Sequence, residues 1–298
     1  MQPVERHALA RGRMRVELAP RTGGALAAVE YGGIPLLRPW NGEPSVRRMA
    51  VYPLLPYSNR IAEGRFRFAG TEHVLRRNFG DHPHPLHGLG WQREWAFVPR
   101  GTHAASMTLG HRPDGEAAAD WPFAFDAEQT VELTDRTVTL TLAFRNADTR
   151  PAPVGLGWHP FFPRHDGAVL RFHADAVWRN DARMLPVERG TVPPAWDFSA
   201  GRPVENPGLD NCFAGFTGTA TLSWPARRLA VTMTADATLG HLVVMTPPPP
   251  ADFFAVEPVM NANDAINRPD PAAHGLRVLA PGESLRVRMT LTVGETNP

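Results

Sequence analysis

Apolar and polar residues alternate along much of the chain. Every second position is apolar over residues 14–18, 138–144, 229–233 and 285–293. Successive side chains of a β-strand point to opposite faces, so this alternation is typical of strands with one buried side. No long stretch repeats its apolar positions with the 3.6-residue period of a helix. The pattern therefore predicts an all-β protein of mostly antiparallel strands.

Proline and glycine separate these strand-like segments at short intervals. The chain has 31 prolines and 26 glycines, which are the residue types that most often form turns. Short strands with closely spaced turns favour a large β-sandwich over alternating strands and helices. The proline run at 247–250 lies between two apolar segments without a change in composition. We therefore predict a single domain over residues 1–298, with the prolines in a stiff loop inside it.

The charge balance excludes several classes of partner. The formal net charge is +1, so the chain has no overall field to attract nucleic acid or an anionic membrane. It has neither an apolar leader nor an apolar run long enough to span a bilayer, and we expect a cytoplasmic protein. Its single cysteine, Cys212, cannot form an internal disulfide, which agrees with a reducing compartment. A small neutral substrate fits this balance best.

The absence of lysine narrows the chemistry further. All 31 residues of the Lys and Arg group are arginines. Schiff-base catalysis, a lysine general base and the phosphate-binding lysine of a P-loop are therefore excluded. Proton transfer has to be carried out by His, Glu, Asp or Tyr.

Three polar segments interrupt apolar sequence, where an unsatisfied polar group is costly. Asn59 and Arg60 lie before a series of aromatic residues, although from these residues alone Arg60 could be a surface arginine. His159 lies among glycines and aromatic residues, where a histidine is often only a core residue. Glu257 follows an apolar strand. A glutamate in such a place is either paired or has a raised pKa that suits a general base.

A fourth segment contains three histidines, His82, His84 and His87. The spacing His-x-His is common among metal ligands. A β-sandwich metalloenzyme of the cupin type would add a carboxylate shortly after the pair, where this chain has Gly88 and Leu89. We therefore predict that this segment holds no metal and that His82 and His84 are turn residues.

Together, these segments resemble the motifs of the aldose 1-epimerase family. The motifs, in chain order, are Asn59-Arg60-Ile61, Leu86-His87-Gly88, Gly157-Trp158-His159-Pro160-Phe161-Phe162, Leu209-Asp210-Asn211-Cys212-Phe213 and Val256-Glu257-Pro258. Their order and spacing are similar to those of the family from about Gly23 to Val293. Leu89, Trp158 and Pro258 differ from the residues usual in galactose-acting members, which resembles a less characterised bacterial branch.

The resemblance implies a fold, a reaction and a set of site residues. The fold is the galactose mutarotase-like supersandwich, a large antiparallel β-sandwich. Glu257 aligns with the catalytic base and His159 with the catalytic acid. The positions that align with hexose-binding residues are Arg60, His87 and Asp210, and Asn59 aligns with a supporting residue. The family needs no metal or organic cofactor, its partner is a small sugar, and we expect a monomer or homodimer.

The implied reaction suits these residue types. Interconversion of the α and β anomers of an aldose requires removal of a proton from the C1 hydroxyl and protonation of the ring oxygen. The ring then opens to an aldehyde, and closure after rotation about C1–C2 presents the other face. Both proton transfers occur near neutral pH, which suits a histidine and a glutamate with a raised pKa.

Three alternatives remain open at this stage. The arginine pairs Arg47-Arg48 and Arg76-Arg77 could bind the phosphate of a hexose phosphate and so indicate a hexose-phosphate 1-epimerase. A glycoside hydrolase could pair Glu257 with Asp210 or Asp264, although it would not require His159. A noncatalytic carbohydrate-binding protein is the third alternative.

Overall fold

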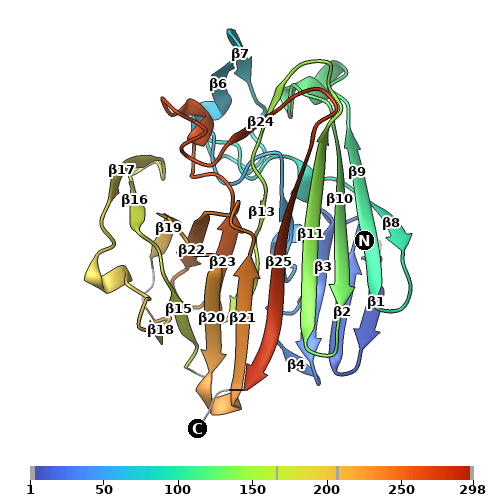
Figure 1. Ribbon diagram of the computed structural model, residues 1–298, viewed down its shortest axis with the longest axis vertical. Coiled ribbons are helices and arrows are strands. Elements are labelled where there is room, and N and C mark those ends of the chain that lie inside the picture. The colour runs from blue at the N-terminus through green and yellow to red at the C-terminus, as the bar shows by residue number, and fades with distance from the viewer. Residues whose placement is uncertain (1–3, 166, 206–207, 296–298) are drawn as a thin grey trace.

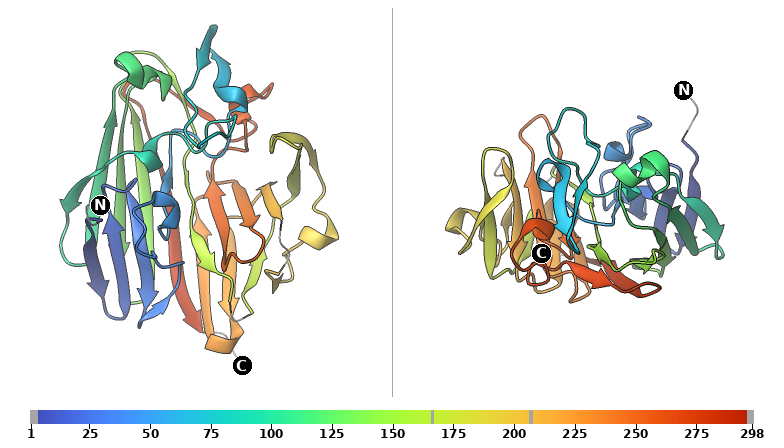
Figure 2. Two further views of the ribbon diagram at one scale, coloured as in Figure 1. Left: turned by 180° about the vertical axis from the view of Figure 1, so that it is seen from behind. Right: turned by 90° about the horizontal axis from the view of Figure 1, so that it is seen from above.

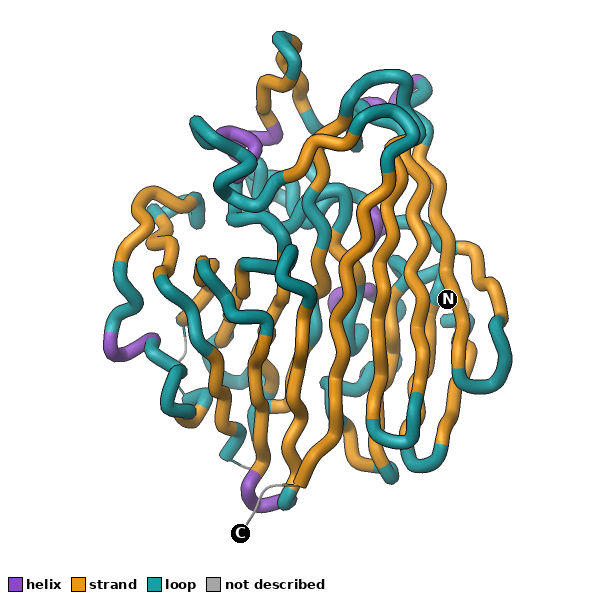
Figure 3. The backbone as a smooth tube through the Cα atoms, in the orientation of Figure 1, coloured by secondary structure: helices purple, strands orange, loops and turns teal. Residues whose placement is uncertain are grey.

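Strands form nearly all of the regular structure. The computed structural model describes residues 4–165, 167–205 and 208–295. In Figure 3 the strands dominate the tube, and the helices are short segments between them. The described helices are short segments of 3-10 type: η1 (Val46–Arg48), η2 (Ala62–Gly64), η3 (Gly90–Gln92), η4 (Gly115–Ala119), η5 (Pro194–Trp196), η6 (Pro225–Arg227) and η7 (Ala265–Asn267).

A sheet of nine strands extends across the molecule (Figure 1). Neighbouring strands in it run antiparallel. Their order is β18 (Arg202–Pro203), β15 (Val169–Phe172), β20 (Thr219–Trp224), β21 (Leu229–Ala235), β25 (Ser284–Glu295), β11 (Thr137–Asn146), β10 (Phe125–Leu133), β9 (Ala104–His111) and β8 (Ala96–Pro99).

A second sheet of eight strands contains Asp210 and Glu257, and His159 directly follows one of its strands. Its order is β17 (Pro186–Gly190), β16 (Ala176–Asn180), β19 (Leu209–Ala214), β22 (His241–Thr246), β23 (Phe253–Val259), β13 (Gly157–Trp158) and β5 (Pro53–Leu54), with β14 (Phe161–Pro163) paired beside β23. The proline run at 247–250 connects β22 to β23, which are antiparallel neighbours. It is a loop inside one sheet, as predicted.

Three smaller sheets complete the structure. The strands β1 (His7–Arg11), β2 (Met14–Ala19), β3 (Ala25–Tyr31) and β4 (Ile34–Pro35) form one, β6 (Arg65–Phe68) pairs with β7 (Thr71–Val74), and β12 (Ala152–Val154) pairs with β24 (Arg277–Leu279). Seen from behind in Figure 2, the first of these sheets lies against the strands β8–β11. No described helix is long and apolar enough to cross a membrane.

The predicted alternation of apolar and polar residues places one face of each strand in the core. In β11 every second residue from Val138 to Phe144 is buried, and the residues between them are more exposed. These side chains join one apolar cluster with Leu242 and Val256 of the eight-stranded sheet. Each fully buried large apolar side chain contributes about 1.5–3 kcal/mol to stability. The four segments that the sequence identified by alternation all lie in strands, β2, β11, β21 and β25, and the all-β prediction is confirmed.

Candidate active site

One pocket of about 400 Å³ collects all six site residues that the sequence predicts. They are Asn59, Arg60, His87, His159, Asp210 and Glu257. The remaining lining is aromatic, apolar or charged and consists of Arg38, Glu43, Ser45, Arg47, Arg48, Tyr52, Phe79, Leu86, Trp91, Phe161, Met245 and Phe253. Segments that are up to about two hundred residues apart in the sequence therefore meet in one place.

The register of the eight-stranded sheet directs Glu257 into this pocket. Successive residues of a strand face opposite sides. Phe254 and Val256 of β23 join the large core between the sheets, whereas Ala255 belongs to a second cluster on the other face. Glu257 lies two residues after Ala255 and so shares its face. Val243 of β22 pairs directly with Glu257 and also belongs to the second cluster.

His159 reaches the pocket by the same alternation. Trp158 points into the core, where its indole N–H donates to Gln129 Oε1 at 2.7 Å. The next residue, His159, therefore faces the opposite side, and its backbone N–H is held by the carbonyl of Tyr52 at 3.0 Å. Gly157 is required here because a Cβ atom would lie 2.7 Å from Val259 Cγ1. The short β13 can therefore approach β23 closely and bring His159 beside Glu257.

Two residues with left-handed backbone conformation fix His87. Asn59 and His87 have φ values of 58° and 61°, which is uncommon for residues other than glycine. His87 N–H donates to the carbonyl of Asn59 at 2.8 Å, and Asn59 N–H donates to His87 Nδ1 at 3.1 Å. Because Nδ1 accepts this bond, the proton of the neutral ring resides on Nε2. Burial and the nearby Arg60 lower the pKa of His87 to about 3, so the ring is a neutral N–H donor.

Arg60 and Asp210 form a second charged group in the pocket. Arg60 Nη2 lies 3.4 Å from Asp210 Oδ2. Asn59 Oδ1 accepts from both the backbone N–H and Nη1 of Arg60, each at 3.0 Å. On the other side, Asn180 Nδ2 donates to the carbonyl of Asp210 at 2.8 Å. Asn59 therefore orients Arg60.

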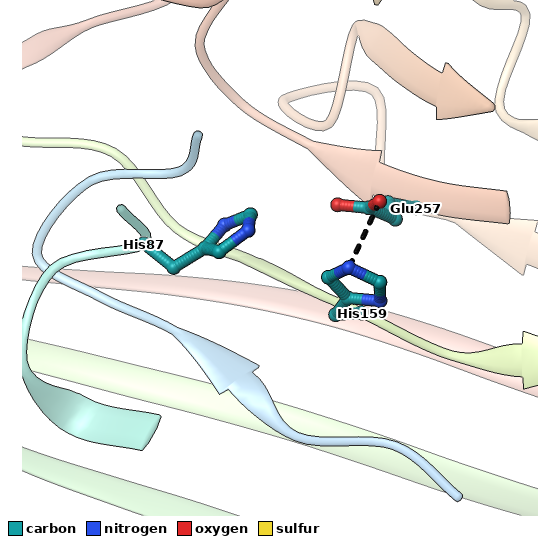
Figure 4. A group of neighbouring side chains, drawn as sticks. All are labelled: His87, His159 and Glu257. Atoms are coloured by element: carbon teal, nitrogen blue, oxygen red, sulfur yellow. Dashed lines mark ion pairs between the residues drawn. The ribbon is translucent and has the colours of Figure 1, made fainter. Parts of the chain in front are cut away.

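His159 and Glu257 are in direct contact. Figure 4 shows the ion pair between His159 Nε2 and Glu257 Oε1, which are 3.2 Å apart, with His87 approaching from a separate loop. Both side chains are buried. Burial, followed by the charge of Asp210, raises the pKa of Glu257 well above its ordinary value. Burial, followed by the neighbouring His87, lowers the pKa of His159. The two groups thus favour a state in which they share one proton.

Polar atoms of this pair remain available to a ligand. Glu257 Oε2 and His159 Nδ1 are buried and have no hydrogen-bond partner among the described residues. A buried polar atom without a partner is costly. A bound molecule with hydroxyl groups would supply the missing hydrogen bonds.

Aromatic rings form one wall of the pocket. The ring centroid of His159 lies 4.9 Å from Tyr52 and 4.4 Å from Phe161. Tyr52 also stacks on Trp91 at 5.7 Å. The sequence places His159 among aromatic residues but does not identify Tyr52 or Trp91. Only the folded chain brings Tyr52 next to His159 and Trp91 next to Tyr52, because they come from separate segments.

In the structure, His87 is separated from His82 and His84, whose ring centroids lie 5.3 Å apart. His82 Nδ1 and the backbone carbonyl of His84 are 2.9 Å apart, and His84 Nδ1 accepts from Glu63 N–H at 2.9 Å. These two rings stabilise turns, whereas His87 lines the pocket. In the described chain, the group spaced for a metal is instead His87, His159 and Glu257, whose ligand atoms lie within 4.8 Å of one another.

Two alternative assignments lose some of their candidate residues, whereas Asp210, Arg47 and Arg48 remain in the pocket. Asp264, a possible partner for Glu257 in a hydrolase, accepts hydrogen bonds from Ala62 N–H at 2.9 Å and Asn267 Nδ2 at 2.8 Å. It does not line the pocket. Arg76 and Arg77 line a separate pocket of about 190 Å³, away from His159 and Glu257.

Comparison with known proteins agrees with this geometry. A family model described as aldose 1-epimerase matches residues 8–292. The uncharacterized protein YphB of Escherichia coli K12 is 29% identical over an alignment of 294 residues, which covers 96% of this chain and 98% of YphB. The uncharacterized protein YihR of the same organism is 24% identical over an alignment of 222 residues, which covers 72% of this chain and 71% of YihR.

Solved structures share the fold. The crystal structure of a putative aldose 1-epimerase from Escherichia coli K12 superposes with a TM-score of 0.91 at 28% identity, covering 98% of this chain and 99% of that one. A galactose mutarotase-like protein from Clostridium acetobutylicum superposes with a TM-score of 0.87 at 17% identity, covering 97% and 95%. The predicted mutarotase-like supersandwich is confirmed.

Proposed function

The chain belongs to the aldose 1-epimerase family, and on this premise we propose that it interconverts the α and β anomers of an aldose. Glu257 is the general base and His159 the general acid. The observation that carries the proposal is the 3.2 Å contact between these two side chains inside the pocket. Both are proton-transfer groups whose pKa values burial moves toward each other.

The reaction needs one proton acceptor and one donor on the same sugar. Glu257 takes the proton of the C1 hydroxyl, and His159 gives a proton to the ring oxygen. The bond between C1 and the ring oxygen breaks, and C1 becomes an aldehyde. After rotation about C1–C2, the ring oxygen attacks the other face of C1, and both protons return by the reverse route. No net proton is gained or lost.

The environment matches the strengths of the two groups to this task. A raised pKa makes the Glu257 carboxylate a stronger base than an exposed glutamate, and a lowered pKa makes protonated His159 a stronger acid. Each positioned acid or base contributes about 10²- to 10⁴-fold to the rate. The active form carries one proton on the pair, on His159 when the sugar binds.

Three further residues are placed to hold the sugar. The Nε2–H of His87 can donate to a sugar oxygen. Arg60 donates and Asp210 accepts, as recognition of adjacent hydroxyls requires. The aromatic wall formed by Tyr52 and Phe161 offers an apolar surface to the C–H face of the ring.

The test is the rate at which a freshly dissolved single anomer reaches equilibrium. Polarimetry of several aldoses should show a rate that rises in proportion to protein concentration above the spontaneous rate in the same buffer. Saturable sugar binding without any acceleration would instead identify a noncatalytic carbohydrate-binding protein.

A further inference from the structure

The pocket lining contains more arginines than the proposed proton transfers and hydroxyl contacts require. Its lining includes the arginines Arg38, Arg47, Arg48 and Arg60, against the carboxyl groups of Glu43, Asp210 and Glu257. Arg60 is paired with Asp210 at 3.4 Å, and Arg48 with Glu43 at 3.0 Å. Glu257 is in contact with His159. Two arginines therefore remain for which the lining supplies no carboxylate.

Arg38 is held rigidly in the wall of the pocket. Its guanidinium carbon lies 3.9 Å from the ring centroid of Phe161 and 4.3 Å from that of Phe253. Nη2 donates to the carbonyls of Arg47 at 2.6 Å and Met49 at 3.0 Å. Nε is buried and has no partner among the described residues. Burial lowers the pKa of Arg38 to about 10, although the charges of Tyr52 and Asp252 oppose this shift. Its guanidinium makes no ion pair with a carboxylate of the pocket lining.

Arg47 stands beside it at the rim. Its guanidinium carbon lies 4.6 Å from the ring centroid of Phe79, another residue of the lining. Its side chain makes no ion pair with a described carboxylate, and its backbone carbonyl is the one that Arg38 binds. Arg47 thus belongs to the short segment that includes η1, and the guanidinium of Arg38 is hydrogen-bonded to the backbone of that same segment.

Of these two cations, Arg38 is one aromatic ring away from the acid-base pair. Phe161 lies against His159 at 4.4 Å between ring centroids, and the same ring carries the guanidinium of Arg38. In a pyranose, C1 and C5 are both bonded to the ring oxygen. When His159 is at the ring oxygen, the C6 group on C5 lies within one sugar ring of the reacting bond.

We infer that the substrate is an anionic aldose, with a carboxylate or a phosphate ester at C6 bound by Arg38 and Arg47. This inference rests on the proposed epimerase function and specifies its substrate class. Guanidinium groups bind carboxylates and phosphates through charge-assisted hydrogen bonds with defined geometry. A neutral sugar would leave both cations without an ion pair inside the pocket.

The experiment compares three substrates that differ only at C6. Exchange between anomers is measured by NMR exchange spectroscopy at equilibrium for D-glucose, D-glucuronate and D-glucose 6-phosphate, each against a control without enzyme. We expect kcat/KM for at least one anionic sugar to exceed that for glucose by about 10-fold or more, the worth of one charged contact. The glucuronate and phosphate arms distinguish the two anions. Equal kcat/KM for all three sugars would overturn the inference and leave the epimerase intact.

Variants tie the preference to these residues. Arg47→Gln should lower the ratio of kcat/KM for the anionic sugar over glucose by about 10-fold. Arg38→Gln should lower this ratio as well. If the Arg38→Gln protein is poorly folded, Arg38→Lys is used instead; because it keeps the charge, it should retain part of the preference for the anionic sugar. The matched control is Arg77→Gln, because Arg77 lines the other pocket. An unchanged ratio in both Arg47→Gln and Arg38→Gln would overturn the assignment.

A binding measurement separates failure of this inference from failure of the epimerase function. If no sugar shows accelerated exchange, the epimerase proposal is wrong. Calorimetric titration with D-glucuronate then tests the arginines alone. Binding that Arg47→Gln weakens, with no binding of glucose, supports the anion site, whereas absence of glucuronate binding contradicts it.

Discussion

Two ion pairs lie side by side in the pocket and differ in how far each is removed from water. The side chains of His159 and Glu257 are 8% and 3% exposed, whereas those of Arg60 and Asp210 are 10% and 28% exposed. Burial disfavours charge on both members of the first pair. The second pair joins a guanidinium to a carboxylate, and Asp210 retains contact with solvent. The first pair is therefore suited to move a proton and the second to hold a fixed charge.

The two pairs also influence each other. The charge of Asp210 raises the pKa of Glu257, and that of Arg60 lowers it. Because these two effects oppose one another, the Arg60–Asp210 pair can contact sugar hydroxyls while its net effect on the pKa of Glu257 stays smaller than that of either charge alone. The division of labour depends on both partners of the second pair remaining in place.

The largest expected effect is loss of a proton-transfer group. Glu257→Gln keeps the shape of the side chain and removes the base, and His159→Asn removes the acid. Each should lower kcat by about 10²- to 10⁴-fold, with the measured rate corrected for spontaneous anomer exchange. If Glu257→Gln retained nearly full kcat while remaining folded by circular dichroism, Glu257 would not be the base.

A smaller effect is expected for the binding pair. Asp210→Asn and Arg60→Ala should raise KM by about 10-fold with a smaller change in kcat, provided that their contacts are equally strong in the ground state and the transition state. Asp210→Asn also removes a charge that raises the pKa of Glu257, so the alkaline limb of its kcat profile should move to lower pH. A kcat loss as large as that of Glu257→Gln would contradict the distinction between the two pairs.

The sequence predicted the regular parts of the fold for a physical reason. In β11 and β25 an apolar residue at every second position can be satisfied only by burial of one face, so the alternation determines both the strand and its inward side. In the pocket, by contrast, the chain is irregular. Asn59 and His87 have positive φ values and come from loops whose path the alternation does not specify.

The pocket residues were predicted to different degrees. His159 and Glu257 could be identified because polar groups in apolar segments, together with the family motifs, mark them. Tyr52 and Arg38 could not, because an aromatic or basic residue in a loop carries no sign of what it will contact. The net charge of +1 favoured a neutral substrate, but a total over the whole chain says nothing of how arginines are distributed around one pocket.

The raised pKa of Glu257 also predicts a pH dependence of stability. A glutamate in the unfolded chain has a pKa of about 4.3, whereas the folded protein retains the proton of Glu257 to higher pH. Its contribution to stability is therefore fully present below the unfolded pKa and is lost as pH rises through the folded pKa. The free energy of unfolding of the wild type relative to Glu257→Gln should fall by up to about 1.4 kcal/mol per pH unit within this window.

Urea denaturation of both proteins at several pH values measures this difference. Glutamine does not titrate, so the comparison isolates Glu257 and the changes that it causes in His159. Parallel pH dependences of the two proteins would show that Glu257 is charged in the folded state at neutral pH, and the contrast between the two ion pairs would then disappear.

The smallest expected effect is that of metal removal, where no change in rate is predicted. His87, His159 and Glu257 are spaced closely enough to surround a metal ion. A ligand nitrogen, however, must present a lone pair. Nδ1 of His87 accepts the N–H of Asn59, so its Nε2 carries the proton and has no lone pair to give. Exhaustive dialysis against EDTA should therefore leave kcat and KM unchanged. Activity that disappeared and then returned on addition of a divalent ion would show that catalysis depends on a metal ion, and the mechanism in which His159 and Glu257 share one proton would be wrong.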